Sequence, residues 1–266
     1  SLPPAPSFIE PEIMRQSLKL YHTNKLFQFL SFHFGQEATE ELMLRYHVGT
    51  SKHWPGATVF WQVDISGRVR TGKVMLYNPE NGRRIKEPHN YITWVHSLLK
   101  KENFNLRQCL FGEHLLTSDQ QRPVALVESE KSALISSFYL PQYLWIASGG
   151  KNGAFNRDAM SVLLFPDLGA TDYWNSKMEM IRSLGIEVSL FDFMERNATK
   201  EERDAGYDIA DFLLREETKE AILNRLITLN PALKTLVETF DLQLVDVKKA
   251  PFSATVQHAR EGLFKR

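Results

Sequence analysis

The chain reads PVALVESEKSAL from Pro123 to Leu134. The apolar run over 124–127 stops at the carboxylate of Glu128, and a pattern that suits a helix follows within a few residues. A short, continuous apolar run of this kind is typical of a strand that is buried on both faces of a parallel sheet. The stretch therefore predicts a strand that ends at Glu128 and leads into a helix.

The same pattern occurs a second time, in SVLLFPDLGA from Ser161 to Ala170, where the apolar run ends just before Asp167. In an open parallel sheet, ligands bind beyond the carboxyl ends of the strands. Two acids that different strands deliver to that edge can share one divalent cation. We therefore expect Glu128 and Asp167 to form a Mg²⁺ (or Mn²⁺) site for chemistry on phosphates. The alternative is that such acids only favour the positive ends of the following helices.

From Arg122 onward, strand and helix patterns alternate, which predicts an α/β fold with a parallel sheet and flanking helices. A smaller α+β portion precedes it, with helices separated by Gly35, then an antiparallel meander and a further helix. The predicted elements are helices within 10–46, the meander over 58–85, a helix over 94–101, strands over 124–127, 143–147, 161–165 and 187–191, and helices over 131–139 and 172–184.

Three parts are predicted along the chain. Residues 1–116 would form a basic, helical and antiparallel-β subdomain, residues 117–216 the α/β domain, and residues 217–266 a C-terminal helical extension. The total of 266 residues is enough for one large or two modest domains.

Charge is balanced overall but is unevenly distributed. The 32 basic and 32 acidic side chains cancel, so no global field draws the protein to nucleic acid. Residues 52–107 nevertheless contain ten basic and four acidic side chains, whereas residues 192–246 contain seven basic and thirteen acidic ones. A basic surface beside an acidic α/β unit suits a phosphate backbone that lies on one part while its reacting end meets a metal on the other.

Other features of the sequence limit the classes of protein to which the chain could belong. Cys109 is the only cysteine, so neither an internal disulfide nor a cysteine-based zinc site can form, which fits a reducing cytoplasm. No apolar stretch approaches the ~20 residues that span a bilayer. No positively charged leader precedes an apolar run in this sequence, so we expect no secretion signal. The sequence begins at Ser1 rather than at Met, and we therefore expect a fragment from which an upstream domain is missing.

The remaining candidate site residues are four acids and eight bases. Asp208 and Asp211 are possible metal ligands, but either could instead cap the next helix. Lys151 lies in the glycine-containing loop SGGKNG (148–153), which could approach a phosphate or could be a simple turn with a solvated lysine. The further metal candidates are Asp172 and Asp192, and the candidate nucleic-acid or phosphate contacts are Arg68, Arg70, Lys73, Arg83, Arg84, Lys86, Lys131 and Lys151. Basic side chains on the outer face of a strand can also be merely solvated.

Several of these stretches together resemble the toprim-domain DNA primases of bacteria, phages and mobile elements. The segment VALVESEKSAL (124–134) resembles the first toprim motif, LLFPDLGA (163–170) the second, and DIADFLL (208–214) the segment that closes many of these domains. Upstream, LMLRYHVG (42–49), YNPENGRR (77–84) and LFGEHL (110–115) are similar to the segments that precede toprim in primases. The resemblance covers about residues 37–215.

This resemblance implies a primase-like protein of a plasmid, phage or conjugative transposon. It implies that Glu128 and Asp167 hold Mg²⁺ for template-directed nucleotidyl transfer, that the basic subdomain guides single-stranded DNA, and that nucleotide triphosphates and a replicative helicase are partners. Two positions depart from the pattern: Gly169 replaces the second aspartate of the second motif, and Ser132 stands where many relatives have aspartate. The departures leave two alternatives, a catalytically inactive DNA-binding module and a metal-dependent nuclease on the same fold.

Overall fold

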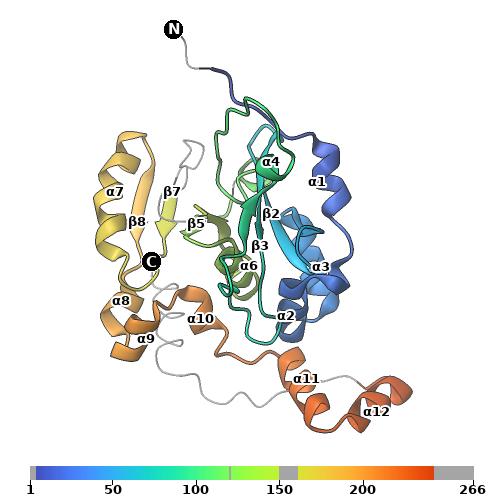
Figure 1. The fold of residues 1–266 in the computed structure, drawn as a ribbon. Helices are drawn as coiled ribbons and strands as arrows, with labels where there is room; N and C mark the ends of the chain where they lie inside the picture. The colour runs from blue at the N-terminus through green and yellow to red at the C-terminus, as the bar shows by residue number, and fades with distance from the viewer. Residues whose placement is uncertain (1–3, 120, 150–160, 243–266) are drawn as a thin grey trace.

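The computed structural model describes residues 4–119, 121–149 and 161–242. Within them the chain forms two four-stranded sheets, one antiparallel and one parallel. Figure 1 shows the parallel sheet between α7 on one side of the molecule and the antiparallel sheet with α1, α2 and α3 on the other. The predicted fold class, an α/β unit preceded by a smaller α+β portion, is thereby confirmed.

The antiparallel sheet has the strand order β1-β2-β3-β4. Its long central pair is the predicted meander, joined at the turn that contains Gly67, which has a positive φ of 74° that glycine adopts without strain. Gly72 is required by packing, because a Cβ there would lie 2.7 Å from the Val59 side chain. The four strands are β1 (Val48–Ser51), β2 (Ala57–Val63), β3 (Val69–Met75) and β4 (Ile92–Trp94).

Helices precede this sheet, as the sequence predicts. The helix α2 begins after Asn24, whose side chain accepts hydrogen bonds from the amides of Leu26 and Phe27, and it ends at Gly35, from which α3 starts. The elements of this block are α1 (Pro11–Ser17), a 3-10 turn η1 (Tyr21–Thr23), α2 (Lys25–Phe34) and α3 (Gln36–Arg45).

The parallel sheet has the order β6-β5-β7-β8, so β5 lies between the strand that follows it and the next one along the chain. All four strands lie where the sequence predicts them, within one residue at each end. Their bounds are β5 (Val124–Val127), β6 (Leu144–Ala147), β7 (Ser161–Leu164) and β8 (Glu187–Leu190), and the long helices beside them are α6 (Glu130–Tyr139) and α7 (Thr171–Ser183).

Short helices complete the described chain. The helix predicted over 94–101 is wrong in part, because Trp94 ends strand β4 and only one helical turn follows it. The remaining helices are α4 (Val95–Leu98), α5 (Leu115–Ser118), α8 (Phe193–Asn197), α9 (Lys200–Ala205), α10 (Ile209–Leu213), α11 (Lys219–Leu229) and α12 (Ala232–Phe240). No helix among the described residues combines the length and the apolar character that a membrane crossing requires.

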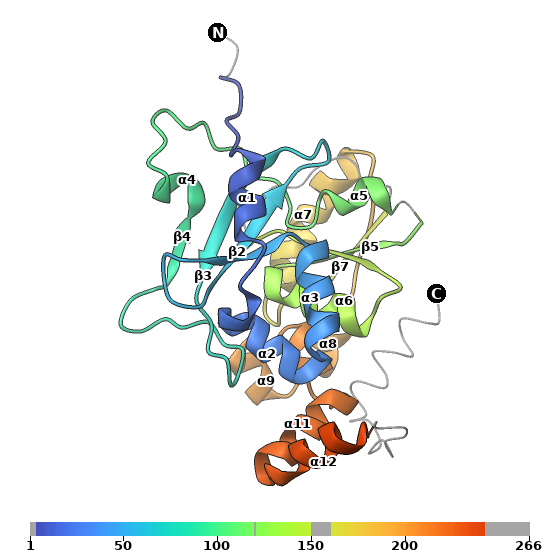
Figure 2. The same ribbon diagram turned by 90° about the vertical axis from the view of Figure 1, so that its right-hand side faces the viewer.

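The antiparallel sheet is buried on both faces. Phe60 and Met75 face a large core that also contains the parallel sheet, whereas Val59 and Trp61 face a smaller core closed by Ile9 and its neighbours. Every residue of β2 is buried for this reason. The basic side chains of residues 52–107 therefore reach solvent mainly from turns and loops, and not from an open face of β2. Figure 2 shows α1 lying across this sheet and α3 beside α6.

Candidate functional site

Glu128 and Asp167 leave neighbouring strands at the same edge of the parallel sheet. The strands β5 and β7 pair directly, with Leu126 opposite Leu164, and the amide of Phe165 donates to the Leu126 carbonyl at 2.8 Å. Glu128 and Asp167 follow two and three residues beyond this aligned pair. The predicted placement of two acids by adjacent strand ends is therefore present in the fold.

The Glu128 side chain is buried, with 7% of the residue exposed, and α7 holds it. The indole Nε1–H of Trp174 donates to Glu128 Oε1 at 3.0 Å, and Trp174 is itself only 6% exposed. One carboxylate oxygen of Glu128 is thus oriented by a rigid aromatic side chain from the helix that follows β7. Buried carboxylates are normally satisfied by such donors.

Serines fill the positions next to Glu128. Ser129 caps α6 by accepting a hydrogen bond from the Ser132 amide at 3.1 Å, and the two hydroxyl oxygens lie 2.6 Å apart. The Ser132 hydroxyl also donates to the carboxylate of Asp208. Ser132, which departs from the toprim pattern, thereby joins the start of α6 to the start of α10.

Asp208 and Asp211 form a capping box at the start of α10. Asp208 accepts from the Asp211 amide and Asp211 accepts from the Asp208 amide, each at 3.0 Å. Burial, and then the nearby carboxylate of Asp208, raise the pKa of Asp211 above its ordinary value. The helix-capping alternative for these two acids is therefore observed, and a metal-binding role for them stays a prediction.

Lys73 connects β3 to the start of α6 through a buried ion pair with Glu130. Its ammonium lies 3.1 and 3.2 Å from the two carboxylate oxygens of Glu130 and 3.1 Å from the carbonyl oxygen of Gly149. Lys73 is 9% exposed and Glu130 is 2% exposed. A phosphate contact by Lys73 stays a prediction; in the structure its ammonium has protein acceptors from both α6 and the loop after β6.

Lys131 lies on α6 next to this ion pair and reaches the loop that follows β3. Its ammonium donates to the Gly82 carbonyl at 3.2 Å, and Gly82 is tightly packed because a Cβ there would lie 2.4 Å from the Phe29 ring. The same loop carries Arg83 and Arg84 and leads to Lys86; Arg83 and Lys86 are exposed and Arg84 is half-buried. The Lys131 bond to Gly82 thus attaches the loop with these three basic side chains to the start of α6.

Arg68 lies just before β3 and Arg70 lies within it, and both side chains converge on the same acid of the protein. Both guanidinium groups pair with Asp64, at 3.0 and 2.8 Å, and both lie over the ring of Phe8 at 4.8 and 5.0 Å. Asp64 is 2% exposed; burial opposes its ionisation, but hydrogen bonds from the amide of Arg68 and the side chain of Arg70 hold its pKa below the ordinary value. A nucleic-acid contact by these arginines stays a prediction.

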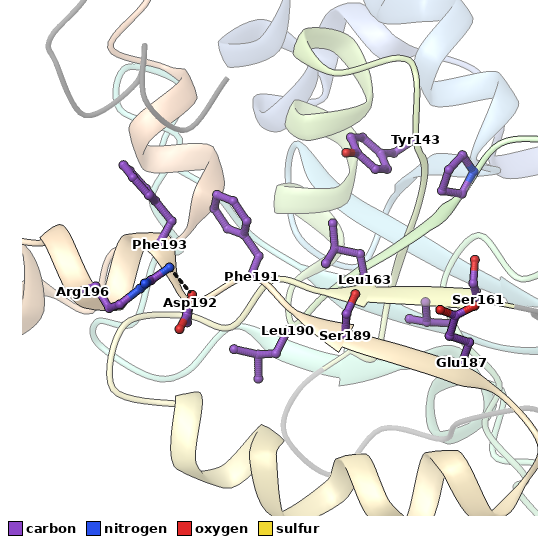
Figure 3. Close-up of a pocket in the computed structure, with 12 residues that line it drawn as sticks. Tyr143, Ser161, Leu163, Glu187, Ser189, Leu190, Phe191, Asp192, Phe193 and Arg196 are labelled. Atoms are coloured by element: carbon purple, nitrogen blue, oxygen red, sulfur yellow. Dashed lines mark ion pairs between the residues drawn. The ribbon is translucent and has the colours of Figure 1, made fainter. Parts of the chain in front are cut away.

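Asp172 and Asp192 lie in different surroundings. Asp172 is exposed in the first turn of α7, where a carboxylate suits the helix dipole. Asp192 pairs with Arg196 at 2.8 Å at one end of a groove of about 350 Å³ over β7 and β8. Figure 3 shows this groove, which Leu163, Ser189 and Phe191 line. Lys151 lies outside the described residues.

A carboxylate that sequence reasoning missed stands beside Gly169. Glu195, on α8, accepts from the Gly169 amide at 2.9 Å and from the Thr171 hydroxyl at 3.3 Å, and it pairs with Arg203. The Gly169 amide is the main reason that the pKa of Glu195 is lowered. Glu195 is 26 residues from Gly169 in the chain, and no local pattern signals this contact.

The six candidate acids do not gather into one cluster. Among the described residues, no three His, Cys, Asp or Glu side chains come together as a group that could hold a metal ion. A site here would consist of the Glu128 and Asp167 pair with further ligands from water or substrate. This donor set fits Mg²⁺, which commonly takes one or two carboxylates and completes its shell with water and phosphate oxygens.

The fold is that of an α/β protein in which Glu128 and Asp167 follow adjacent parallel strands, beside an antiparallel sheet. The family model described as "Domain of unknown function (DUF6371)" matches residues 24–168, which is more than half of the chain, and the chain belongs to that family. No curated protein matches the sequence.

The structural neighbours include catalytic cores of bacterial primases at low sequence identity. The RNA polymerase domain of Mycobacterium tuberculosis primase DnaG is 10% identical, with 95% of this chain and 96% of that chain covered and a TM-score of 0.48. The E. coli primase catalytic core is 12% identical, with 84% and 89% covered and a TM-score of 0.46. The Aquifex aeolicus primase (zinc-binding and RNA polymerase domains) is 13% identical, with 86% and 68% covered and a TM-score of 0.41.

Proposed function

We propose that this chain is a primase-like nucleic-acid-binding protein of a mobile element that performs Mg²⁺-dependent, template-directed nucleotidyl transfer. The observation that carries the proposal is that Glu128 and Asp167 follow the adjacent strands β5 and β7, at the same edge of the sheet. Parallel sheets bind ligands at this edge. Bound Mg²⁺ supplies orientation of the triphosphate and stabilisation of charge that develops on the transferred phosphoryl group.

The chain's own residues supply binding and orientation. Glu128 is held by Trp174, so its carboxylate is ordered before a ligand arrives. Ordering of a ligand by a hydrogen-bonded neighbour is a general feature of metal sites. Arg83, Arg84 and Lys86 extend from the loop that Lys131 anchors, and they bind the template backbone through phosphate contacts. Lys151 remains a candidate contact for nucleotide phosphates.

The partners in this proposal are single-stranded DNA, nucleotide triphosphates and a replicative helicase, with the cytoplasm as the place of action. Residues 1–116 guide the template, residues 117–216 hold the metal site, and residues 217–266 form a C-terminal extension.

A second candidate function is a nucleic-acid-binding module without catalysis. Gly169 favours it, because this glycine stands where the toprim pattern has its second aspartate and its amide is bound by Glu195. A metal site with one carboxylate fewer binds its ion more weakly, since ligand charge and number set affinity. Nucleic-acid binding through the loop that carries Arg83 and Arg84 does not need that carboxylate.

A primer-synthesis assay on single-stranded template separates these functions. The chain is compared with Glu128→Gln and Asp167→Asn, with and without Mg²⁺, and Glu179→Gln on the exposed side of α7 is the matched control. Mg²⁺-dependent product that both site variants lose and the control keeps supports nucleotidyl transfer. Template binding without product supports the module, and shortened template supports a nuclease; either result would overturn the synthesis proposal.

A further inference from the structure

The C-terminal helices α11 and α12 form a hairpin at one end of the molecule. The helix α11 is fastened to α2, because Asn224 donates to the Phe32 carbonyl at 3.0 Å and Thr218 donates to the His33 carbonyl. The helix α12 packs on α11, and none of its residues is buried. Figures 1 and 2 both show this hairpin beyond the two sheets.

The hairpin exposes three large apolar side chains, Leu229, Leu236 and Phe240, and the side of α12 that carries Leu236 and Phe240 is an exposed apolar face. Their exposed fractions are 74%, 47% and 66%, which include the two largest among the big apolar side chains of the described chain. Leu236 and Phe240 are one helical turn apart and therefore share a side of α12. Large apolar side chains on an amphipathic helix normally pack against another element, so this face is suited to a further segment.

We propose that residues 243–266 of the same chain bind this apolar face. The described chain reaches Leu242, immediately beyond α12, so the segment starts at the face itself. Asp241 ends α12 in a left-handed conformation (φ 47°), and the Leu242 amide donates to the Val237 carbonyl at 3.0 Å. A left-handed residue of this kind ends the helix, so the segment starts just beyond the end of α12 that carries Phe240.

The sequence of the segment supplies apolar side chains for the face. Leu244, Val245 and Val247 come first, and Phe252 and Val256 follow, so apolar side chains are available along its length. A tether of a few residues also raises the effective concentration to the millimolar range.

Thiol labelling in the full chain tests the proposal. Cys109, the only native cysteine, is 5% exposed, so a cysteine introduced at the surface is the main reactive thiol. Leu236→Cys is compared with Met180→Cys on α7, a matched control because the two native side chains are 47% and 50% exposed among the described residues. We expect a maleimide to label Leu236→Cys at least tenfold more slowly, and Phe252→Ser with Val256→Ser to restore fast labelling.

The same labelling measurement distinguishes the chain's own segment from a second copy of the protein as the occupant of this face. Protection by the chain's own segment is independent of protein concentration between about 1 and 100 μM, because the contact is intramolecular. Protection that grows with concentration would assign the face to a second copy and overturn the proposal. Equal labelling of the two cysteines would overturn it too, as would protection that survives the substitutions at Phe252 and Val256.

Discussion

The indole Nε1–H of Trp174 donates to Glu128 Oε1 at 3.0 Å, and this bond joins α7 to the end of β5. The two residues are 46 positions apart in the chain, and each is less than a tenth exposed. The bond therefore connects the acid that follows one strand to the helix that follows its neighbour, and it couples folding of the sheet to the geometry of the candidate site.

Trp174→Phe should lower the free energy of unfolding by about 1–3 kcal/mol, because a buried acceptor then loses its donor. In the proposed metal site it should also weaken Mn²⁺ binding by about tenfold or more, as loss of an orienting neighbour does elsewhere. Urea unfolding measures the first effect, and electron paramagnetic resonance of free Mn²⁺ measures the second.

A double-mutant cycle with Glu128→Gln assigns the effect to this pair. The coupling energy between the two positions should be about 0.5–3 kcal/mol, as for residues in direct contact. Trp54→Phe, at a half-buried position in the antiparallel part, is the control for loss of an indole. Additive effects at positions 174 and 128 would contradict the pairing.

Lys73→Met should be more harmful, because it leaves Glu130 buried without its ammonium. Removal of one partner from a buried ion pair costs about 3–5 kcal/mol, whereas replacement of both is often nearly neutral. The double variant Lys73→Met, Glu130→Met should therefore regain most of the lost stability in urea unfolding. Lys52→Met, at an exposed position, should change stability little. A double variant as unstable as Lys73→Met alone would show that the pair itself stabilises the fold.

Much of the parallel sheet could be predicted from the sequence, because β5 and β6 are short, wholly buried apolar runs and β7 and β8 are partly buried runs that end at a turn or helix. The position of Glu128 and Asp167 at one edge follows from that pattern and from the pairing of β5 with β7. The strands β1 and β4 could not be predicted in the same way. The second half of β1 and all of β4 are only half-buried, and both segments are strands because the longer β2 and β3 pair with them.

The side-chain contacts of the site residues could be identified only from the three-dimensional structure. Lys73 alternates with its neighbours on β3 like a solvated lysine, and its burial results from the contact of that strand with α6 and the loop after β6. Glu195 reaches Gly169, and Trp174 reaches Glu128, across distances in the chain that no local pattern records. Asp208 and Asp211 differ, because capping is a local interaction: the sequence indicated that either aspartate could cap the next helix, and the structure shows both in one capping box.

Arg83→Gln with Lys86→Gln should weaken the binding of single-stranded DNA and should also make it less sensitive to salt. Each phosphate contact on a single strand contributes about 0.7 to the slope of log affinity against log salt concentration, so loss of two contacts lowers the slope by about 1.4. Fluorescence anisotropy across a salt series measures this. Lys234→Gln on α12 removes an exposed lysine elsewhere and should leave the slope unchanged. An unchanged slope in the double variant would exclude this loop from the interface.

His114 should make the stability of the protein fall in weak acid. Burial, and then the neighbouring His47, lower the pKa of His114 to about 4, and the two rings stack with centroids 4.2 Å apart. The unfolded chain binds a proton near pH 6.5, so the folded state is favoured above that pH and loses this advantage as the pH falls toward 4. The full loss is roughly 3 kcal/mol for a shift of this size. His114→Gln can still donate to the Arg45 carbonyl that His114 Nε2 contacts at 3.0 Å, and it should therefore lose less stability between about pH 7.5 and 5 in urea unfolding. His22→Gln, at an exposed position, is the control and should keep the pH dependence of the native chain. If His114→Gln lost as much stability between these pH values as the native chain does, the pH dependence could not be assigned to His114.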